Sequence, residues 1–153
     1  SSDLVSSRLC DWTGPIALVD TSRRMLQEAM RKNTVSTIRA NAECLPFADE
    51  CFERILVVDA LHHFRDPFQA LAELARILKS GGRLLIQEPN IHRFPVKVVA
   101  FLEKIAGMQS RMFPYEDIAR RLGELGLFVQ SEPYGRFSTW AIADKSNRPS
   151  DIP

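Results

Sequence analysis

The 153-residue chain predicts an α/β fold, in which helices cover a mostly parallel sheet and an antiparallel strand pair follows near the C-terminal end. Two observations support this prediction. Short apolar runs without alternation recur along the chain, and such runs are typical of parallel strands covered on both faces. Segments with helical spacing of apolar residues separate these runs. The length suits one domain.

The first forty residues predict two helices and two strands. Ser2–Cys10 has a short apolar stripe that indicates a helix. Ile16–Val19 is a continuous apolar run, typical of a buried strand, whereas Val35–Ala40 alternates with polar residues and is expected nearer an edge. Between the strands, Thr21 or Ser22 can cap a helix. Its predicted buried face consists of Met25, Leu26, Ala29 and Met30.

A third helix carries clear signals at both ends. Asp66 is a good N-cap, Pro67 suits the first helical position, and Gln69 completes a capping box. We expect Gly81-Gly82 to end the helix. Its predicted buried face consists of Phe68, Leu71, Ala72, Ala75 and Leu78.

The remaining elements follow from the same patterns. They are a loop over Asn41–Glu50, strands over Ile55–Val58 and Leu84–Ile86, helices over Val96–Ala106 and Tyr115–Leu125, and an antiparallel pair over Leu127–Glu132 and Phe137–Ala143. In the last helix we expect Ile118, Leu122 and Leu125 to face inward and Gly126 to end it. We place the domain at residues 1–143, with 90–114 as a substrate-binding or lid insertion and 144–153 as a polar tail.

Composition excludes several classes of protein. The 20 Lys and Arg against 19 Asp and Glu give a net charge of +1, so no global charge favours a nucleic-acid partner. Cys10, Cys44 and Cys51 lack the CxxC spacing of a zinc site or a disulfide framework, which favours free thiols in a reducing cytoplasm and no bound metal. The chain has no signal-peptide pattern and no apolar run near the ~20 residues of a membrane span.

Polar side chains stand where the predicted strands end, and ligands of open α/β sheets bind beyond those carboxyl ends. Asp20 can accept both hydrogens of a ribose diol, or it can simply cap the following helix. Asn41 can read an adenine amino group, or it can be an ordinary turn residue. His62 and His63 offer a general base, or one packs inward while the other is solvated.

Four segments, taken together, resemble class I methyltransferases that use S-adenosylmethionine, and in particular the type 11 small-molecule group. Residues 16–26 resemble "VDxSxxML", residues 42–52 resemble "AExLPFxDxSFD", residues 61–67 resemble "LHHxxDP", and residues 72–89 resemble "xELxRVLKPGGxLxIxEP". Each motif is weak alone, but their order and spacing over about half the chain make a specific signal. The resemblance implies a Rossmann-like three-layer αβα sandwich and methyl transfer to a small-molecule acceptor.

The resemblance also implies roles for individual residues. Asp20 would hold the ribose hydroxyls, and His63 or His62 is the candidate catalytic residue. A base is needed only where the acceptor must lose a proton, because the sulfonium methyl group is already activated. The other implied cofactor-binding residues are Thr21, Met25, Asn41, Ala42, Glu43, Asp59 and Ala60.

The chain departs from this family in one feature. The glycine-rich GxGxG loop and its strand, which the family places before the first helix, are not found in the 153 residues. We therefore expect an N-terminally incomplete sandwich, with strand exchange in a homodimer as the alternative. Three alternatives stay open: a non-catalytic methyltransferase-like interaction or structural module, a truncated chain unable to bind the cofactor, and a dehydrogenase in which Asp20 binds a nicotinamide ribose.

Overall fold

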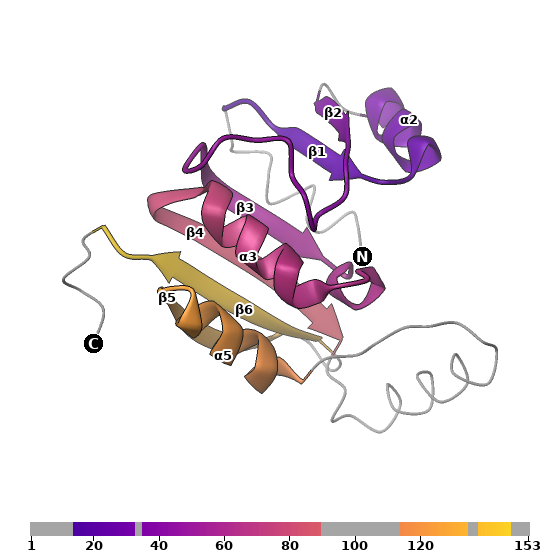
Figure 1. Ribbon diagram of the computed structural model, residues 1–153. Coiled ribbons are helices and arrows are strands. Elements are labelled where there is room, and N and C mark those ends of the chain that lie inside the picture. Colours follow the sequence, from indigo (N-terminus) through magenta and orange to yellow (C-terminus); the bar gives the residue numbers. More distant parts are fainter. Residues whose placement is uncertain (1–13, 33–34, 90–113, 135–137, 148–153) are drawn as a thin grey trace, which may run out of the picture. The chain divides into compact units, whose positions relative to one another are not determined.

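The computed structural model describes residues 14–32, 35–89, 114–134 and 138–147 (Figure 1). The chain divides into two compact units, Ser1–Asn41 and Ala42–Pro153. The helices expected over Ser2–Cys10 and Val96–Ala106 lie outside the described residues.

The first unit is a strand–helix–strand motif. It consists of β1 (Ala17–Asp20), α2 (Arg23–Lys32) and β2 (Ser36–Arg39). The two strands pair in parallel, with Ala17 opposite Ser36 and Asp20 opposite Arg39. The two strands and the connecting helix confirm the elements predicted for residues 16–40. The expectation that the first strand is buried was wrong, because none of the residues of β1 is buried and Leu18 is 37% exposed.

The packing of α2 differs from the prediction. Ser22 caps the helix, since its Oγ accepts a hydrogen bond from the Met25 amide at 3.4 Å. Leu26 is buried as expected, but Met25 and Met30 are 49% and 62% exposed. The predicted four-residue buried face was therefore wrong at both methionines. Within the described part of this unit, α2 has only a two-stranded sheet to pack against, and that contact is too narrow to cover the wider apolar stripe.

The second unit contains a four-stranded mixed sheet with the order β3-β4-β6-β5 (Figure 1). Its strands are β3 (Phe52–Val58), β4 (Leu78–Pro89), β5 (Leu127–Tyr134) and β6 (Ser138–Lys145). β3 and β4 are parallel, whereas β6 is antiparallel to both β4 and β5. This confirms the predicted C-terminal antiparallel pair, although β6 continues to Lys145.

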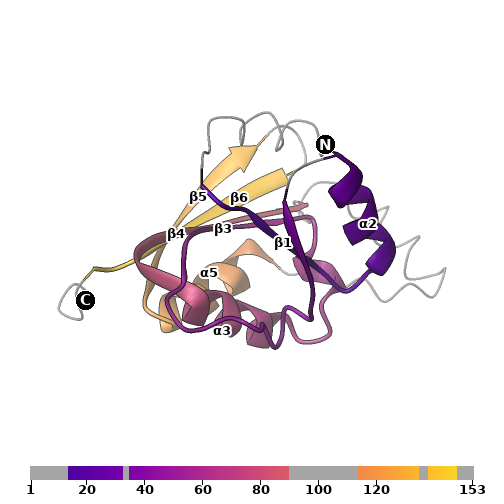
Figure 2. The ribbon, with the colours of Figure 1, turned by 90° about the horizontal axis from the view of Figure 1, so that it is seen from above.

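Helices α3 (Pro67–Ile77) and α5 (Tyr115–Glu124) lie on the same face of this sheet (Figure 2). The largest side chains of this core that are less than 2% exposed are Leu61, Leu71, Leu78, Leu84, Ile86 and Leu122. In the α5 helix, Ile118 and Leu122 are buried as predicted, and Gly126 follows with a left-handed φ of 81°. The unit therefore has the sheet and one helical layer among its described residues.

The start of α3 confirms the predicted cap. Asp66 Oδ1 accepts a hydrogen bond from the Gln69 amide at 3.0 Å, and Pro67 is the first helical residue. The predicted buried face was only partly right, because Phe68 and Ala72 are half-buried. Their places in the core are taken by Ala70, Leu74 and Ile77. Because α3 packs against α5 as well as against the sheet, its buried face differs from the apolar stripe predicted from the sequence.

The two adjacent glycines do not end α3, which corrects the prediction. The helix ends at Ile77, and Leu78 is already extended, with φ −75° and ψ 127°. Gly81 and Gly82 lie inside β4, next to a shift of register between Phe52 and Arg54 on β3. Gly81 has a φ of 74°, so the pair forms an irregularity within a strand.

Candidate functional site

In the first unit, Asp20 is the last residue of β1 and stabilises the turn into α2. Its Oδ1 accepts a hydrogen bond from the Ser22 amide at 2.7 Å. The Thr21 carbonyl accepts a hydrogen bond from Arg39 Nε at 3.0 Å, which ties the same turn to β2. Asp20 thus caps the turn, as one of its two interpretations predicted, and this contact uses one of its two carboxylate oxygens. Thr21 and Met25 are both exposed.

The loop after β2 is attached to α3 by acidic side chains. Glu43 Oε1 accepts a hydrogen bond from the Asp66 amide at 2.8 Å, next to the N-cap of α3. Glu73 Oε2 accepts a hydrogen bond from the Leu45 amide, also at 2.8 Å. These two contacts fix the path of the loop that begins at Ala42, whose side chain is half-buried. Asn41 closes the first unit and is exposed.

Arg76 holds the same loop from the opposite end of α3, a role that the sequence did not reveal. Its guanidinium donates to the carbonyls of Phe47 and Leu45 at 2.8 and 3.2 Å, and to Asp49 Oδ1 at 2.7 Å. It also donates to both oxygens of Glu73 at 2.9 Å. The hydrogen bond from Arg76 lowers the pKa of Glu73, and the Glu73 carboxylate in turn raises the pKa of Arg76.

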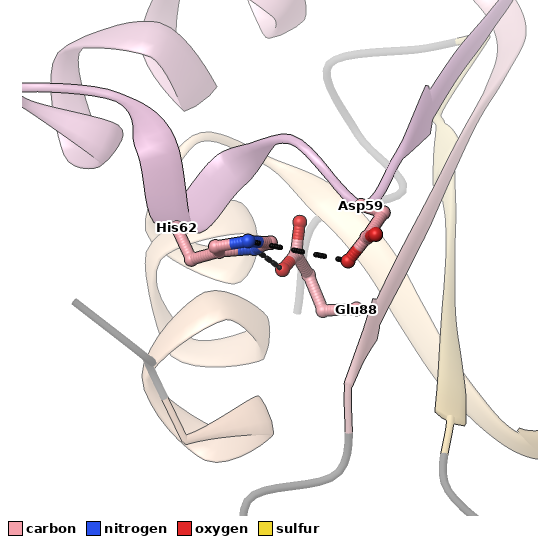
Figure 3. A group of neighbouring side chains, drawn as sticks. All are labelled: Asp59, His62 and Glu88. Carbon is pink, nitrogen blue, oxygen red and sulfur yellow. Dashed lines mark hydrogen bonds and ion pairs between the residues drawn. The ribbon is translucent and has the colours of Figure 1, made fainter. Parts of the chain in front are cut away.

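Asp59, His62 and Glu88 form a cluster at the carboxyl ends of β3 and β4 (Figure 3). Glu88 accepts three hydrogen bonds. Oε1 accepts from the Ala60 and Leu61 amides at 3.2 and 2.7 Å, and Oε2 lies 2.7 Å from His62 Nδ1. This carboxylate therefore fixes the turn η1 (Leu61–His63) and the His62 ring together.

Asp59 completes the cluster from an unusual backbone conformation. Its φ of 51° lies in the left-handed region, which is uncommon for a residue other than glycine, and strained residues of this kind concentrate at functional sites. The Asp59 amide donates to the Gln87 carbonyl at 2.9 Å, which anchors the turn to β4. Asp59 Oδ1 lies 4.0 Å from His62 Nε2, and its side chain is 64% exposed.

The two adjacent histidines have different environments. His62 is buried, at 8% exposed, whereas His63 is exposed. Their ring centroids are 4.0 Å apart, with the planes tilted by 48°. One histidine thus packs inward and the other is solvated, and it is His62 that contacts Glu88.

The cluster suits acid–base chemistry better than cation binding. One ligand atom from each of the three side chains lies within 4.8 Å of the others, as a cation site would require. However, both oxygens of Glu88 already accept hydrogen bonds from protein groups. A buried imidazole held by a carboxylate is an arrangement that orients a proton acceptor.

The structure brings together only some of the residues that the sequence singled out. Asp59, Ala60 and His62 meet at one sheet edge, where Ala60 contributes its backbone amide. Glu43 instead contacts Asp66. Glu88 lies within the segment 72–89 that resembles the family motif, but that resemblance implied no role for it. The available signal was an acidic residue just after the predicted strand over Leu84–Ile86.

None of the described helices is long and apolar enough to cross a membrane.

Solved structures define the class of protein. A SAM-dependent methyltransferase from Thermotoga maritima, titled a possible histamine N-methyltransferase, is 28% identical with a TM-score of 0.74, and the match covers 86% of this chain and 73% of that one. The YcgJ protein of Bacillus subtilis is 18% identical with a TM-score of 0.78, and the match covers 94% of this chain and 87% of that one. At this identity the likeness supports the fold alone. The fold is that of the Rossmann-like, class I S-adenosylmethionine-dependent methyltransferases.

The family follows from the sequence match. A model described as "Methyltransferase domain" matches residues 2–86, more than half of the chain, which therefore belongs to the type 11 methyltransferase family. A ubiquinone/menaquinone biosynthesis C-methyltransferase from Francisella philomiragia is 33% identical over 67% of this chain and 48% of its own length. The enzyme of the same name from Psychromonas ingrahamii is 39% identical over 54% of this chain and 36% of its own length. The chain spans about half the length of such curated relatives, or less.

Proposed function

We propose that this chain transfers a methyl group from S-adenosylmethionine to a small-molecule acceptor. The observation that carries the proposal is the position of Asp20, a carboxylate at the end of a parallel strand, directly before a helix in the matched methyltransferase segment. Ligands of open α/β sheets bind at such ends, where a carboxylate can accept the two hydrogens of a ribose diol.

The residues around Asp20 fit a ribose ligand. Oδ1 is held by the Ser22 amide, so the carboxylate has a fixed orientation before a ligand arrives. Pre-orientation of this kind lowers the entropy cost of binding. The other side chains and amides that we propose to contact the cofactor are Thr21, Met25, Asn41, Ala42, Glu43, Asp59 and Ala60.

S-adenosylmethionine supplies a methyl group that is already activated by the sulfonium, so the protein mainly has to align the acceptor with it. The loop that begins at Ala42 is well suited to a binding role, because Glu43, Glu73 and Arg76 hold its backbone in place. The turn after β3 is held in the same way by Glu88.

The acceptor class rests on the relatives. The curated relatives are named C-methyltransferases of ubiquinone and menaquinone biosynthesis, and the Thermotoga structure is titled a possible histamine N-methyltransferase. Each of these names refers to a small molecule. We therefore propose a small organic acceptor for this chain, rather than an interaction module without catalytic activity.

Calorimetric titration of the 153-residue chain with S-adenosylhomocysteine tests the proposal. We expect micromolar binding that weakens at least about tenfold in Asp20→Asn, because a hydrogen bond to a charged group contributes about 1.5–3 kcal/mol. Asparagine keeps an acceptor oxygen for the Ser22 amide, so the turn is preserved. Glu28→Gln, an exposed change on α2, is the matched control. No binding at millimolar ligand, or equal binding by Asp20→Asn, would contradict the proposal.

A further inference from the structure

The guanidinium of Arg76 is fully occupied by hydrogen bonds. Nε and Nη2 donate to the two oxygens of Glu73, both at 2.9 Å. Nη1 also donates to the Phe47 carbonyl and to Asp49 Oδ1 at 2.8 and 2.7 Å, and Nη2 donates to the Leu45 carbonyl at 3.2 Å. A guanidinium has five N–H donors, so every donor has a partner here. Three of the five acceptors lie in the loop between β2 and β3, so Arg76 fits one conformation of that loop.

Leu45 is held by its amide, its carbonyl and its side chain. The amide donates to Glu73 Oε2 at 2.8 Å, the carbonyl accepts from Arg76, and the side chain is 7% exposed. Two residues earlier, Glu43 Oε1 accepts a hydrogen bond from the amide of Asp66, the N-cap of α3. The segment from residue 43 to residue 45 is therefore fixed at both of its ends by groups of α3.

This fixed segment directly follows Ala42, which we propose to contact the cofactor together with Glu43. Ala42 has no polar side-chain atom, so it can form hydrogen bonds with a base only through its backbone. Hydrogen bonds weaken steeply when their angle is poor, so backbone recognition requires a chain that is held in one conformation. A loop meets this requirement less readily than a helix or a strand. The contacts of Glu73 and Arg76 attach the loop to a helix and so meet it.

We propose that Arg76, paired with Glu73, is a positioning residue that makes this loop specific for adenine. The inference rests on the proposed methyltransferase function and specifies how the base of its cofactor is selected. Adenine has an acceptor at N1 beside the amino group on C6, whereas hypoxanthine has a donor at N1 beside an acceptor oxygen. The two bases have nearly the same shape, so only correctly placed hydrogen-bonding groups distinguish them. A site built for one pattern rejects the other, because the site's own polar groups are then left unpaired.

Calorimetric titration of the 153-residue chain with S-adenosylhomocysteine and S-inosylhomocysteine tests the inference. The two ligands differ only in the base, so the ratio of their dissociation constants measures base selection. We expect the wild-type chain to bind the inosyl ligand about 10- to 100-fold more weakly, because an unpaired polar group in a binding site costs affinity of that order.

Arg76→Lys removes the clamp and keeps the charge. Lysine donates from a single atom, so it cannot reach all the acceptors that surround the planar guanidinium. We expect the ratio of dissociation constants to fall below about threefold, mainly through weaker binding of S-adenosylhomocysteine. Glu73→Gln keeps an acceptor oxygen for the Leu45 amide but loses the bidentate pair with Arg76, and it should change the ratio in the same direction. Arg120→Lys, the same substitution at an ion pair on α5, is the matched control and should keep the wild-type ratio.

A merely structural role for Arg76 gives a different result. Arg76→Lys would then lower the Tm, but the folded protein would keep the wild-type ratio of dissociation constants. An unchanged ratio in Arg76→Lys overturns the proposal. If Arg76→Lys does not fold, the ratio measured for Glu73→Gln decides in the same way. Equal binding of the two ligands by the wild-type chain also overturns it.

The outcomes for the two proposals are separable. If S-adenosylhomocysteine binds to the wild-type chain and the ratio is the same in both variants, the positioning role of Arg76 is overturned while the cofactor site stands. If neither ligand binds at millimolar concentration, the proposed function fails for this chain, and the inference about Arg76 fails with it.

Discussion

At the scale of single residues, two carboxylates, Glu73 on α3 and Glu88 near the end of β4, fix the loops at the candidate site. Glu88 binds the backbone of the turn after β3, and Glu73 binds the backbone of the loop before β3. Both carboxylates also contact a side chain that holds them in place, His62 and Arg76 respectively. Hydrogen bonds of charged groups are stronger than neutral ones, which suits residues that must hold irregular backbone.

The Glu73–Arg76 contact makes a prediction for the pH dependence of stability. The hydrogen bond from Arg76 lowers the pKa of Glu73 below its ordinary value of 4.5, so Glu73 stabilises the folded state above that pH. This contribution is lost as the pH falls through the folded-state pKa. Urea unfolding should therefore show Glu73→Gln less stable than wild type at pH 7, with the difference shrinking below pH 4.5. A difference that stays constant between pH 7 and pH 3 would contradict this role.

At the scale of elements, the sequence predicted most of the strands and helices but misplaced several strand boundaries, most clearly the start of β4. The caps of α2 and α3 and the end of α5 were local signals, and each was found as predicted. The glycine pair was misread because Gly-Gly after a helix usually marks a helix end. Here Leu78 leaves the helix early, since its side chain fills the core and its backbone pairs with Phe52.

Two glycine substitutions test this interpretation of β4. A Cβ on Gly82 would lie 2.7 Å from the Lys79 carbonyl oxygen and 3.1 Å from that of Glu53, so Gly82→Ala should destabilise the unit. Gly123 lies in α5 with nothing within 4 Å of a Cβ. Gly123→Ala should stabilise the protein by about 0.5–1 kcal/mol, because alanine favours the helix. Equal effects of the two changes in thermal unfolding would show that the backbone at Gly82 has more room than the structure gives it.

At the scale of the whole molecule, the fold was more predictable than the site. Apolar runs and helix caps are local, and they predicted the parallel strands and the antiparallel pair that the structure confirms. The contacts of Glu88, and those of Arg76 with the loop before β3, join residues 26 to 31 positions apart in the chain. Such contacts depend on strand register and helix rotation, which the sequence pattern does not determine. The sequence therefore located the strand ends but not the side chains that hold them.

We propose that the polar groups at these strand ends bind S-adenosylmethionine. The most direct test is a titration of the ¹⁵N-labelled chain with S-adenosylhomocysteine, followed in ¹H–¹⁵N correlation spectra. We predict that the amides of residues 20–25 in the first unit, and those of Ala42, Glu43 and residues 59–61 in the second, shift on titration, while those of α5 do not move. Unchanged spectra for these residues at millimolar ligand, or shifts confined to α5, would contradict cofactor binding at these strand ends.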